Sequence, residues 1–302
     1  MYDTIIVGGG PAGLAAAIYL ARQKLDFLLL GGFLGGKTLW SSDVENYLGF
    51  HLIDGTKLVE KFREHLDDYQ GSFVMREGEM AVRVEKAASG FKVTTDQGTY
   101  ESKTLLIATG EKNRKLNVPG EEEFTNKGVT YCATCDAPLF AGKIVHVIGG
   151  GNSAMDAALF LEKYASAVTI VSVNPELTGE IAMKQKCLLS QKIRFLGSTK
   201  TSRILGDRFV SGIGLIGPDG TEKVEATQGV FIEVGLEPEA DFIDFVEKDK
   251  WGQIVVDKHN RTSSDGVWAA GDVTDVTEKQ IAVAVGEGSK AALDIINYLQ
   301  RK

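Results

Sequence analysis

The chain has 302 residues, of which 43% are hydrophobic and 25% charged, and its formal net charge is −8. This length suffices for two domains that each bury a core of their own. The acidic balance argues against non-specific binding of nucleic acid, whose phosphates attract basic surfaces. Three cysteines are too few for a secreted disulfide scaffold, so we expect a reducing, cytoplasmic location.

The chain opens with a strand, a glycine turn and a helix. Residues 4–7 read TIIV, which is typical of a buried parallel strand, and Leu14 to Gln23 predict an alanine-rich helix. Between them lies a GxGxxG pattern. Gly8 would permit the tight bend, Gly10 would let phosphates approach the backbone, and Gly13 would let helix and strand pack closely. This combination predicts a dinucleotide-binding turn, with the helix start directed at the pyrophosphate.

The uncharged stretch from Thr4 to Ala21 could be mistaken for a membrane span. Glycines and a proline interrupt it, and no basic residue precedes it. A strand, a turn and a helix account for it better, so we expect neither a membrane segment nor a signal peptide.

After the second strand, residues 27–30, the chain departs from the usual pattern. An acidic residue that binds the adenosine ribose should end this strand, and Gly31 and Gly32 stand there instead. The following GGKT, residues 35–38, would let the backbone approach a flat ring system. Asn46 could offer its amide to a cofactor oxygen, and the alternative is a turn-capping asparagine.

Periodicity predicts the rest of this half. Residues 56–69 carry apolar side chains at helical spacing, and residues 73–107 alternate as several strands joined by turns. The LLIATG run, residues 105–110, should return beside the first strand. The charged segment 111–128 contains a Pro-Gly pair and predicts the crossover into a second domain.

The stretch YCATCDAP, residues 131–138, is the centre of the predicted chemistry. Cys132 and Cys135 could form a reversible disulfide, half of a metal site, or a pair of inert thiols. A structural zinc would need two further ligands, but Cys187 is alone and the four histidines are scattered. We therefore predict a redox pair in which one thiolate attacks a disulfide or a flavin ring. Asp136 could hand a proton to the departing thiolate, or could merely cap a helix or turn.

A second strand, glycine turn and helix follow at residues 143–164, with GGGNSA as the turn. The chain therefore carries two Rossmann-like units. The next strand, residues 167–171, should end in an acid for NAD or in arginines for the 2′-phosphate of NADP. Neither is present in the SVN that follows at residues 172–174.

A run of cations without any acid follows. It predicts either a docking face for an acidic electron carrier or an ordinary solvated face. The cations are Lys184, Lys186, Lys192, Arg194, Lys200 and Arg203. Cys187 lies among them, and its leucine neighbours predict a packed core thiol.

Three apolar runs near the end predict strands, at residues 229–235, 253–256 and 266–272. The last ends in Asp272, where a carboxylate could bind cofactor hydroxyls. An amphipathic helix should then run from residue 279 towards residue 299, and its first turn could aim amides at a ring carbonyl.

Taken together, these motifs resemble the low-molecular-weight thioredoxin reductase family over essentially the whole chain. In chain order they read IIVGGGPAG, VENYLGF, LLIATG, YCATCDAPLF, VIGGGNSAMDAA and VWAAGDVTD. The VNPEL segment and the KQIAVAVGEG ending are closer to the flavoprotein component of alkyl hydroperoxide reductase. They also resemble thioredoxin reductases that do not use NADPH, including ferredoxin-linked ones.

The resemblance implies an α/β fold of two Rossmann-like three-layer dinucleotide-binding domains, the second inserted in the first. Residues 1–112 and 240–302 would bind FAD, and residues 113–239 would form the NAD(P)H-type domain with the CxxC pair. The predicted cofactor-binding residues are Gly8, Gly10, Pro11, Ala12, Gly13, Gly31, Gly36, Lys37, Thr38, Asn46, Ala108, Thr109, Gly110, Gly271, Asp272, Lys279, Gln280 and Ile281.

The resemblance also implies a disulfide in which Cys135 faces the flavin and Cys132 attacks the partner, with Asp136 as the acid. In the family, a rotation between the domains moves the disulfide between flavin and partner, and the enzyme is a homodimer. We therefore expect a thioredoxin-like protein as substrate. The alternative of another class is a non-enzymatic, redox-sensing flavoprotein.

The electron donor is predicted from what the second unit lacks. The NADPH branch carries His-Arg-Arg where this chain has Ser172, Val173 and Asn174, and a further Arg at Thr178. The acid that favours NADH in the peroxide-reductase branch would also fall at Ser172. We therefore expect a donor other than NADPH, with reduced ferredoxin favoured and NADH or NADPH as the alternative. No thioredoxin-like segment precedes the first turn, which counts against a peroxide-reductase role. The alternative is an NADH- or NADPH-dependent reductase of a thioredoxin or peroxiredoxin system.

Overall fold

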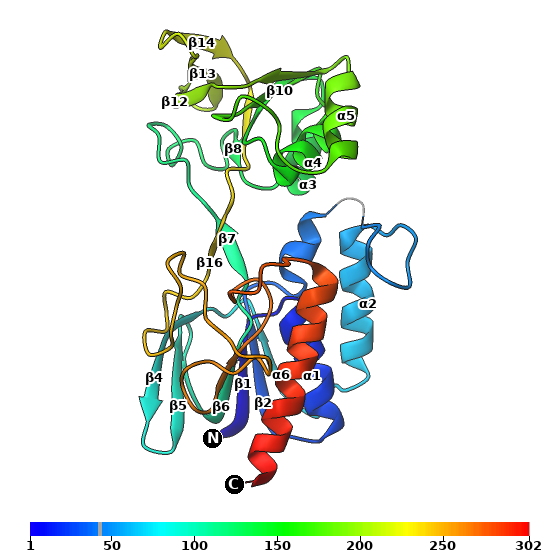
Figure 1. Cartoon of the computed structure of the whole chain (residues 1–302), viewed down its shortest axis with the longest axis vertical. Helices are drawn as coiled ribbons and strands as arrows, with labels where there is room; N and C mark the ends of the chain where they lie inside the picture. Colours follow the sequence, from blue (N-terminus) through cyan, green and yellow to red (C-terminus); the bar gives the residue numbers. More distant parts are fainter. Residues whose placement is uncertain (42–43, 302) are drawn as a thin grey trace. The chain divides into compact units, whose positions relative to one another are not determined.

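The computed structural model describes residues 1–41 and 44–301. The chain divides into two compact units, one formed by Met1–Lys112 with Glu237–Lys302 and the other by Asn113–Leu236. Two short strands, β7 (Glu111–Asn113) and β16 (Leu236–Pro238), pair where the chain passes between the units (Figure 1). The return was predicted at residue 240 and lies at 237. On the first unit's side of this crossing, the Glu239 amide donates to the Gly110 carbonyl at 3.0 Å.

The first unit is built on a seven-stranded sheet. Its parallel part has the order β3 (Val74–Glu77), β2 (Phe27–Gly31), β1 (Tyr2–Val7) and β6 (Thr99–Ile107), and β17 (Val267–Ala269) also pairs with β6. An antiparallel extension follows β6 and contains β5 (Gly90–Thr95) and β4 (Ala81–Ala87). The predicted return of the LLIATG run beside the first strand is confirmed, since Val7 lies opposite Ile107.

The central strands have apolar side chains on both faces because both faces are covered. Ile6 pairs with Leu29 and Leu106, and all three are fully buried. Helices α1 (Pro11–Arg22) and α6 (Ile281–Arg301) share one core with this face, and α2 (Gly55–Asp67) packs beside α1. The three helices lie together on that side in Figure 1.

The opposite face is covered by the segment that follows the return into this unit. Ile243, Val246 and Ile254 are buried there against β-strand side chains such as Ile5. The predicted strand at residues 253–256 was wrong, because Ile254 makes only isolated bridges. Its apolar pattern comes from packing onto the sheet rather than from pairing along an edge.

The second unit has a five-stranded parallel sheet. Its order is β11 (Ile193–Leu196), β10 (Ala167–Val171), β9 (Ile144–Ile148), β15 (Gly229–Ile232) and β8 (Val129–Thr130). One face shares a core with the helices α3 (Ala133–Asp136), α4 (Asn152–Leu161), α5 (Ile181–Leu189) and the 3₁₀ turn η2 (Ala137–Phe140). The other face packs on an antiparallel sheet of β12 (Lys200–Gly206), β13 (Val210–Ile216) and β14 (Glu222–Ala226).

The predicted α/β fold with two Rossmann-like units is confirmed. Both turn helices begin earlier than predicted, α1 at Pro11 and α4 at Asn152, because the residues that close each glycine turn already have helical geometry. Proline suits the first helical position, where its missing amide hydrogen leaves no bond unmade. Within residues 1–41 and 44–301, every helix is too short or too polar to cross a bilayer.

Candidate functional site

The first glycine turn contains positions that the fold requires and one that it does not. A Cβ on Gly13 would lie 1.9 Å from the Gly8 carbonyl oxygen, so helix and strand could not pack with any other residue there. Gly10 has an ordinary φ of −75°, and no described atom lies within 4 Å of the position its Cβ would take. Contacts within the described chain therefore do not require glycine at residue 10. A ligand lying against the backbone would.

A buried hydroxyl points to the same ligand site. Gly36 lies against the first turn, since its Cβ would be 3.2 Å from Gly10 Cα. Thr38, in the 3₁₀ turn η1 (Gly36–Trp40), is 3% exposed, and its Oγ1 has no hydrogen-bond partner in the described part of the chain. Leaving such a group unpaired costs about 1–3 kcal/mol, which a bound polar ligand would offset. The space at Gly10 and the hydroxyl of Thr38 both fit a dinucleotide cofactor.

Charged side chains gather beside this loop. The Lys37 ammonium lies 2.7 Å from a carboxylate oxygen of Glu111 and 2.7 Å from one of Asp272. A second ammonium, that of Lys279, donates to the backbone carbonyls of Asp272 at 3.0 Å and Thr274 at 2.5 Å. Burial lowers the pKa of Lys279. Three residues predicted separately, Lys37, Asp272 and Lys279, are thus brought into one cluster.

Sequence reasoning missed two carboxylates of this cluster. Glu111 directly follows the predicted LLIATG run, which was the available signal. Glu287 lies in the second turn of α6, and its carboxylate accepts a hydrogen bond from the Gly271 amide at 2.7 Å. Burial raises the pKa of Glu287. Nothing in the sequence around Glu287 indicates that it reaches back to Gly271.

Asn46 and Gln280 are also brought together, with the Asn46 amide donating to the Gln280 side-chain oxygen at 3.0 Å. Ile281, the residue after Gln280, begins α6. Thr109 is less available, because its hydroxyl donates to the Glu239 carbonyl at 2.5 Å. Ala108 continues from β6 towards the first turn, and its amide donates to the Val7 carbonyl at 2.7 Å.

Gly31 explains the missing acid at the end of β2. A Cβ at this position would lie 2.8 Å from the Gly9 amide nitrogen, so no side chain fits without a shift. The acid in register on the next strand is Glu77, opposite Gly31. Its carboxylate already accepts two hydrogen bonds from the Arg63 guanidinium.

The second unit holds the predicted redox pair. Cys132 and Cys135 form a disulfide, so their sulfurs are bonded to each other and do not form half of a metal site. Cys135 is exposed and Cys132 half-buried. The Cys135 amide donates to the Cys132 sulfur at 3.2 Å.

Asp136 is held beside the pair by a residue that the sequence did not single out. The Thr130 hydroxyl donates to the Asp136 carboxylate at 2.5 Å, and its oxygen accepts the Cys132 amide at 3.2 Å. Asp136 makes no side-chain capping bond to the 3₁₀ turn that follows it, against the capping alternative. Thr130 therefore links the acid to the backbone of the first cysteine.

The segment before the cysteines is anchored by a buried carboxylate. Glu121 is 4% exposed, and it accepts the backbone amides of Leu116 at 2.7 Å and Asn117 at 2.5 Å. The Tyr131 hydroxyl donates to the same carboxylate at 2.7 Å. Burial raises the pKa of Tyr131, so this hydroxyl keeps its proton. The loop and the cysteine motif are thereby fixed to each other.

The second glycine turn keeps its shape, and short polar side chains flank it. Gly151 has a φ of −91°, and the nearest atom to its Cβ position is Thr178 Oγ1 at 4.0 Å. Thr178 donates its amide and hydroxyl to the Gly150 carbonyl at 2.7 and 3.1 Å. Ser172 is buried, and its hydroxyl oxygen accepts the Asn174 amide at 3.1 Å. Two of the positions at which basic residues were sought, Ser172 and Thr178, thus carry short side chains bonded to the chain's own backbone.

Carboxylates of β14 neutralise part of the predicted run of cations. Arg194 pairs with Glu225, and Arg203 pairs with Glu222 at 3.2 Å. Lys192 donates to backbone carbonyls instead. No acid stands in this stretch of sequence, but the fold brings two acids to it, which weakens the docking-face alternative.

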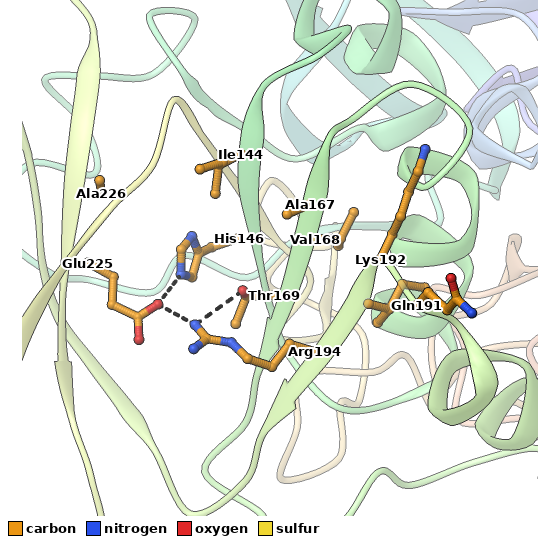
Figure 2. Close-up of a pocket in the computed structure, with 11 residues that line it drawn as sticks. Ile144, His146, Ala167, Val168, Thr169, Gln191, Lys192, Arg194, Glu225 and Ala226 are labelled. Carbon is orange, nitrogen blue, oxygen red and sulfur yellow. Dashed lines mark hydrogen bonds and ion pairs between the residues drawn. The ribbon is translucent and has the colours of Figure 1, made fainter.

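The second unit also holds a pocket of about 500 Å³. In it His146 and Arg194 both point towards Glu225 (Figure 2). The His146 Nε2 lies 3.2 Å from the carboxylate, and burial lowers the pKa of this histidine. Ile144 and Ala167, the first residues of β9 and β10, line the pocket. It lies at the amino ends of strands, whereas the second glycine turn follows their carboxyl ends. This pocket is therefore separate from the predicted site.

Cys187 is a packed core thiol, as predicted. It is 1% exposed, and burial raises its pKa to about 11. It is not poised as a nucleophile at neutral pH.

Comparison with protein families decides the class of this site. Residues 2–288 match the family described as pyridine nucleotide-disulphide oxidoreductase. The chain belongs to this family. Its members and their thioredoxin reductase neighbours are FAD-binding flavoproteins, so the predictions of an oxidoreductase and of FAD as cofactor are confirmed.

Curated relatives in the family are longer than this chain. It is 39% identical over 303 residues to a Bacillus subtilis protein named NADH dehydrogenase, covering 99% of this chain and 59% of that protein. A component of the alkyl hydroperoxide reductase of Staphylococcus aureus is 38% identical with the same coverage. The chain thus spans under two thirds of the length of the curated relatives it matches.

Solved structures of similar length carry the thioredoxin reductase likeness. Thioredoxin reductase of Lactococcus lactis superposes with a TM-score of 0.94 at 34% identity, covering 100% of both chains. That of T. acidophilum gives 0.91 at 41% identity over 98% of each. A ferredoxin-flavin thioredoxin reductase from Clostridium acetobutylicum gives 0.55 at 32% identity, covering 100% of this chain and 99% of that one. The resemblance seen in the sequence motifs is confirmed.

Proposed function

We propose that the chain is an FAD-dependent dithiol–disulfide oxidoreductase that passes electrons through Cys132 and Cys135 to a thioredoxin-like protein. The observation that carries this proposal is the cysteine pair itself. It is bonded, partly exposed, and adjacent to a carboxylate that Thr130 holds in place. The first unit supplies a dinucleotide turn whose Gly10 leaves space for a ligand against the backbone.

The first unit's residues would hold FAD in three groups. Gly10 and the start of α1 would face the pyrophosphate, with the helix N-terminus favouring its charge. Thr38 would give its unpaired hydroxyl to the cofactor. Asp272, and the linked pair of Asn46 and Gln280, would bind hydroxyls and ring atoms. Bound FAD would supply the two electrons and protons that reduce the cysteine pair in each cycle.

The cysteines would then carry out thiol–disulfide exchange. The Cys132 thiolate attacks one sulfur of the substrate disulfide, a Cys132–substrate bond forms, and the second substrate sulfur leaves and takes a proton. Cys135 next loses its proton, and its thiolate attacks the Cys132 sulfur. This restores the disulfide and releases the first substrate sulfur, which takes the second proton. The substrate gains two electrons and two protons, and the cysteine pair loses them.

The structure supports Cys132 as the attacking residue. A backbone amide that donates to a sulfur stabilises the thiolate over the thiol, and the Cys135 amide has this position at 3.2 Å. Asp136 is the proposed proton donor to the departing thiolate. Leu139, three residues further on, is 69% exposed and offers an apolar contact for a protein substrate.

For the donor we propose a carrier other than NADPH, with reduced ferredoxin favoured. Three features support this. Ser172 and Thr178 bond to backbone rather than presenting cations. A similar structure is a ferredoxin-flavin thioredoxin reductase. No arginine stands between residues 172 and 178 to take a 2′-phosphate.

NADH is the second candidate donor, and the open space at Gly151 favours it. Relatives named NADH dehydrogenase point the same way. Anaerobic titration of the FAD-loaded protein with NADH, NADPH and reduced ferredoxin, followed by flavin absorbance, separates the donors. Fast bleaching by ferredoxin alone supports the favoured donor. Fast bleaching by micromolar NADPH would overturn it.

A matched variant sharpens this experiment. Gly151→Val would fill the second turn and should abolish reduction by a pyridine nucleotide, while leaving reduction by ferredoxin unchanged. If NADH reduces the wild-type flavin and the variant equally well, the nucleotide does not use this turn.

We also propose that two copies assemble as a homodimer in the cytoplasm, as in the thioredoxin reductases that the chain resembles. Light scattering coupled to size exclusion tests the assembly directly. A monomer at micromolar concentration would contradict it.

A further inference from the structure

Lys37 is held by two carboxylates that come from distant parts of the chain. Glu111 is the first residue of β7, and Asp272 follows β17. Both distances are 2.7 Å, and the side chains are only 24% exposed for Lys37, 9% for Glu111 and 19% for Asp272. Ion pairs this shielded from water interact more strongly than those at the surface.

The cluster adjoins the predicted cofactor site. Lys37 lies between Gly36, which contacts Gly10, and Thr38, whose buried hydroxyl is unpaired. The Gly35 amide also donates to the Gly9 carbonyl at 2.7 Å, which fixes this loop against the phosphate turn. A change of charge on Lys37 or Glu111 would therefore be felt by a cofactor bound here.

The cluster holds more carboxylates than ammonium groups. Lys37 and Lys279 are the cations, and Glu111, Asp272 and Glu287 carry the carboxyl groups. Glu287 accepts the Gly271 amide, and burial raises its pKa. Lys279 donates to backbone carbonyls, so the direct neutralisation of the other two carboxylates falls to Lys37. Without Lys37, two adjacent carboxylates would face each other with no cation between them.

We propose that the fixed positive charge of Lys37 helps to set the reduction potential of the bound flavin. This inference rests on the proposed function. Reduction adds negative charge at the site, and a nearby cation stabilises that state. Glu111 acts in the opposite direction, and Lys37 masks it. Lys37 thus makes the flavin a better electron acceptor than the same site with a neutral residue.

A purely structural role for Lys37 predicts something different. If the ion pairs only fasten the loop to β7, removing either Lys37 or Glu111 would loosen the site in the same way. Both variants would then bind FAD more weakly, and their potentials would move in the same direction or not at all. The sign of the shift separates the two roles.

The test compares Lys37→Met, Glu111→Gln, the double variant and Lys37→Arg as purified FAD-loaded proteins. The midpoint potential of the flavin is measured by equilibration with a reference dye, and FAD affinity by fluorescence titration. We expect a more negative potential for Lys37→Met and a more positive one for Glu111→Gln. The double variant should fall between them, and Lys37→Arg should match the wild type.

Shifts of the same sign in both single variants, or no shift in either, would overturn the inference. If Lys37→Met does not fold, Glu111→Gln still decides, since a negative shift or none contradicts the proposal. A wild-type protein that binds no FAD would instead refute the proposed function itself. Wild-type FAD binding with same-sign shifts refutes only the role of Lys37.

Discussion

Gly10→Ala separates what the fold needs from what the cofactor needs. The added methyl group meets no described atom within 4 Å, and φ is −75°, so the folded chain accommodates it. Restricting the unfolded chain stabilises by about 0.4–1 kcal/mol. Gly10 is also the N-cap of α1, where alanine is worse than glycine by a similar amount. The two effects oppose each other, so the free energy of unfolding without cofactor should change by less than about 1 kcal/mol.

FAD binding should respond much more strongly to the same change. The methyl group would occupy the space through which the pyrophosphate approaches the backbone, and overpacking of this kind costs about 1–3 kcal/mol. The dissociation constant for FAD should therefore rise roughly five- to 150-fold. The assay pairs a urea melt of the cofactor-free protein with a fluorescence titration of FAD.

Gly13→Ala is the matched control. Its Cβ would lie 1.9 Å from the Gly8 carbonyl oxygen, so this variant should lose stability even without cofactor. Gly10→Ala that binds FAD as tightly as the wild type would refute the assignment of the first turn. Gly10→Ala that unfolds as readily as Gly13→Ala would refute the steric argument.

Three further outcomes follow from the second unit. Cys135→Ser should keep FAD but lose reduction of a thioredoxin-like protein. Cys187→Ala, which changes a buried thiol, should retain that reduction. Full activity of Cys135→Ser would disprove the thiol assignment. Thr130→Val removes the hydroxyl bonded to Asp136 and should slow thiol–disulfide exchange roughly two- to tenfold, measured by rapid mixing across pH, and an unchanged rate would exclude its positioning role. Burial raises the pKa of Glu233 from 4.5 to about 8, so the folded state holds a proton that the unfolded chain has lost. The free energy of unfolding therefore falls as pH rises through this interval, by at most about 1.4 kcal/mol per pH unit. Glu233→Gln should flatten that fall in urea melts between pH 5 and 8, and parallel curves for the two proteins would contradict the shift.

Local pattern was sufficient to predict the parallel strands beside the two glycine turns, but no strand was predicted in residues 200–226, where β12, β13 and β14 form a sheet. The TIIV run is buried on both faces and pairs in register with the two neighbouring strands, as β-branched runs in parallel sheets do. Gly8 and Gly13 stand at fixed spacing because the packing of one short turn requires both. Residues 253–256 show the limit, since the same apolar pattern serves a segment that packs on a sheet without joining it.

The site was predictable only in part, because its partners are set by tertiary closeness. Lys37, Asp272 and Cys132 lie in motifs and could be named from the sequence. Glu111 and Thr130 could not be assigned roles, since nothing local shows that one meets Lys37 and the other meets Asp136. The neutralisation of Arg194 by Glu225 is a similar case, because 30 residues of chain separate two side chains that the sheets bring together.

The central claim is that electrons pass from bound FAD through the cysteine pair to another protein's disulfide. It is tested most directly by mixing the fully reduced, FAD-loaded enzyme anaerobically with an oxidised thioredoxin and following flavin absorbance. We predict that the wild-type flavin reoxidises as thioredoxin thiols appear, and that the flavin of Cys132→Ser stays reduced. Equal reoxidation of both proteins, or a wild-type flavin that stays reduced, would contradict it.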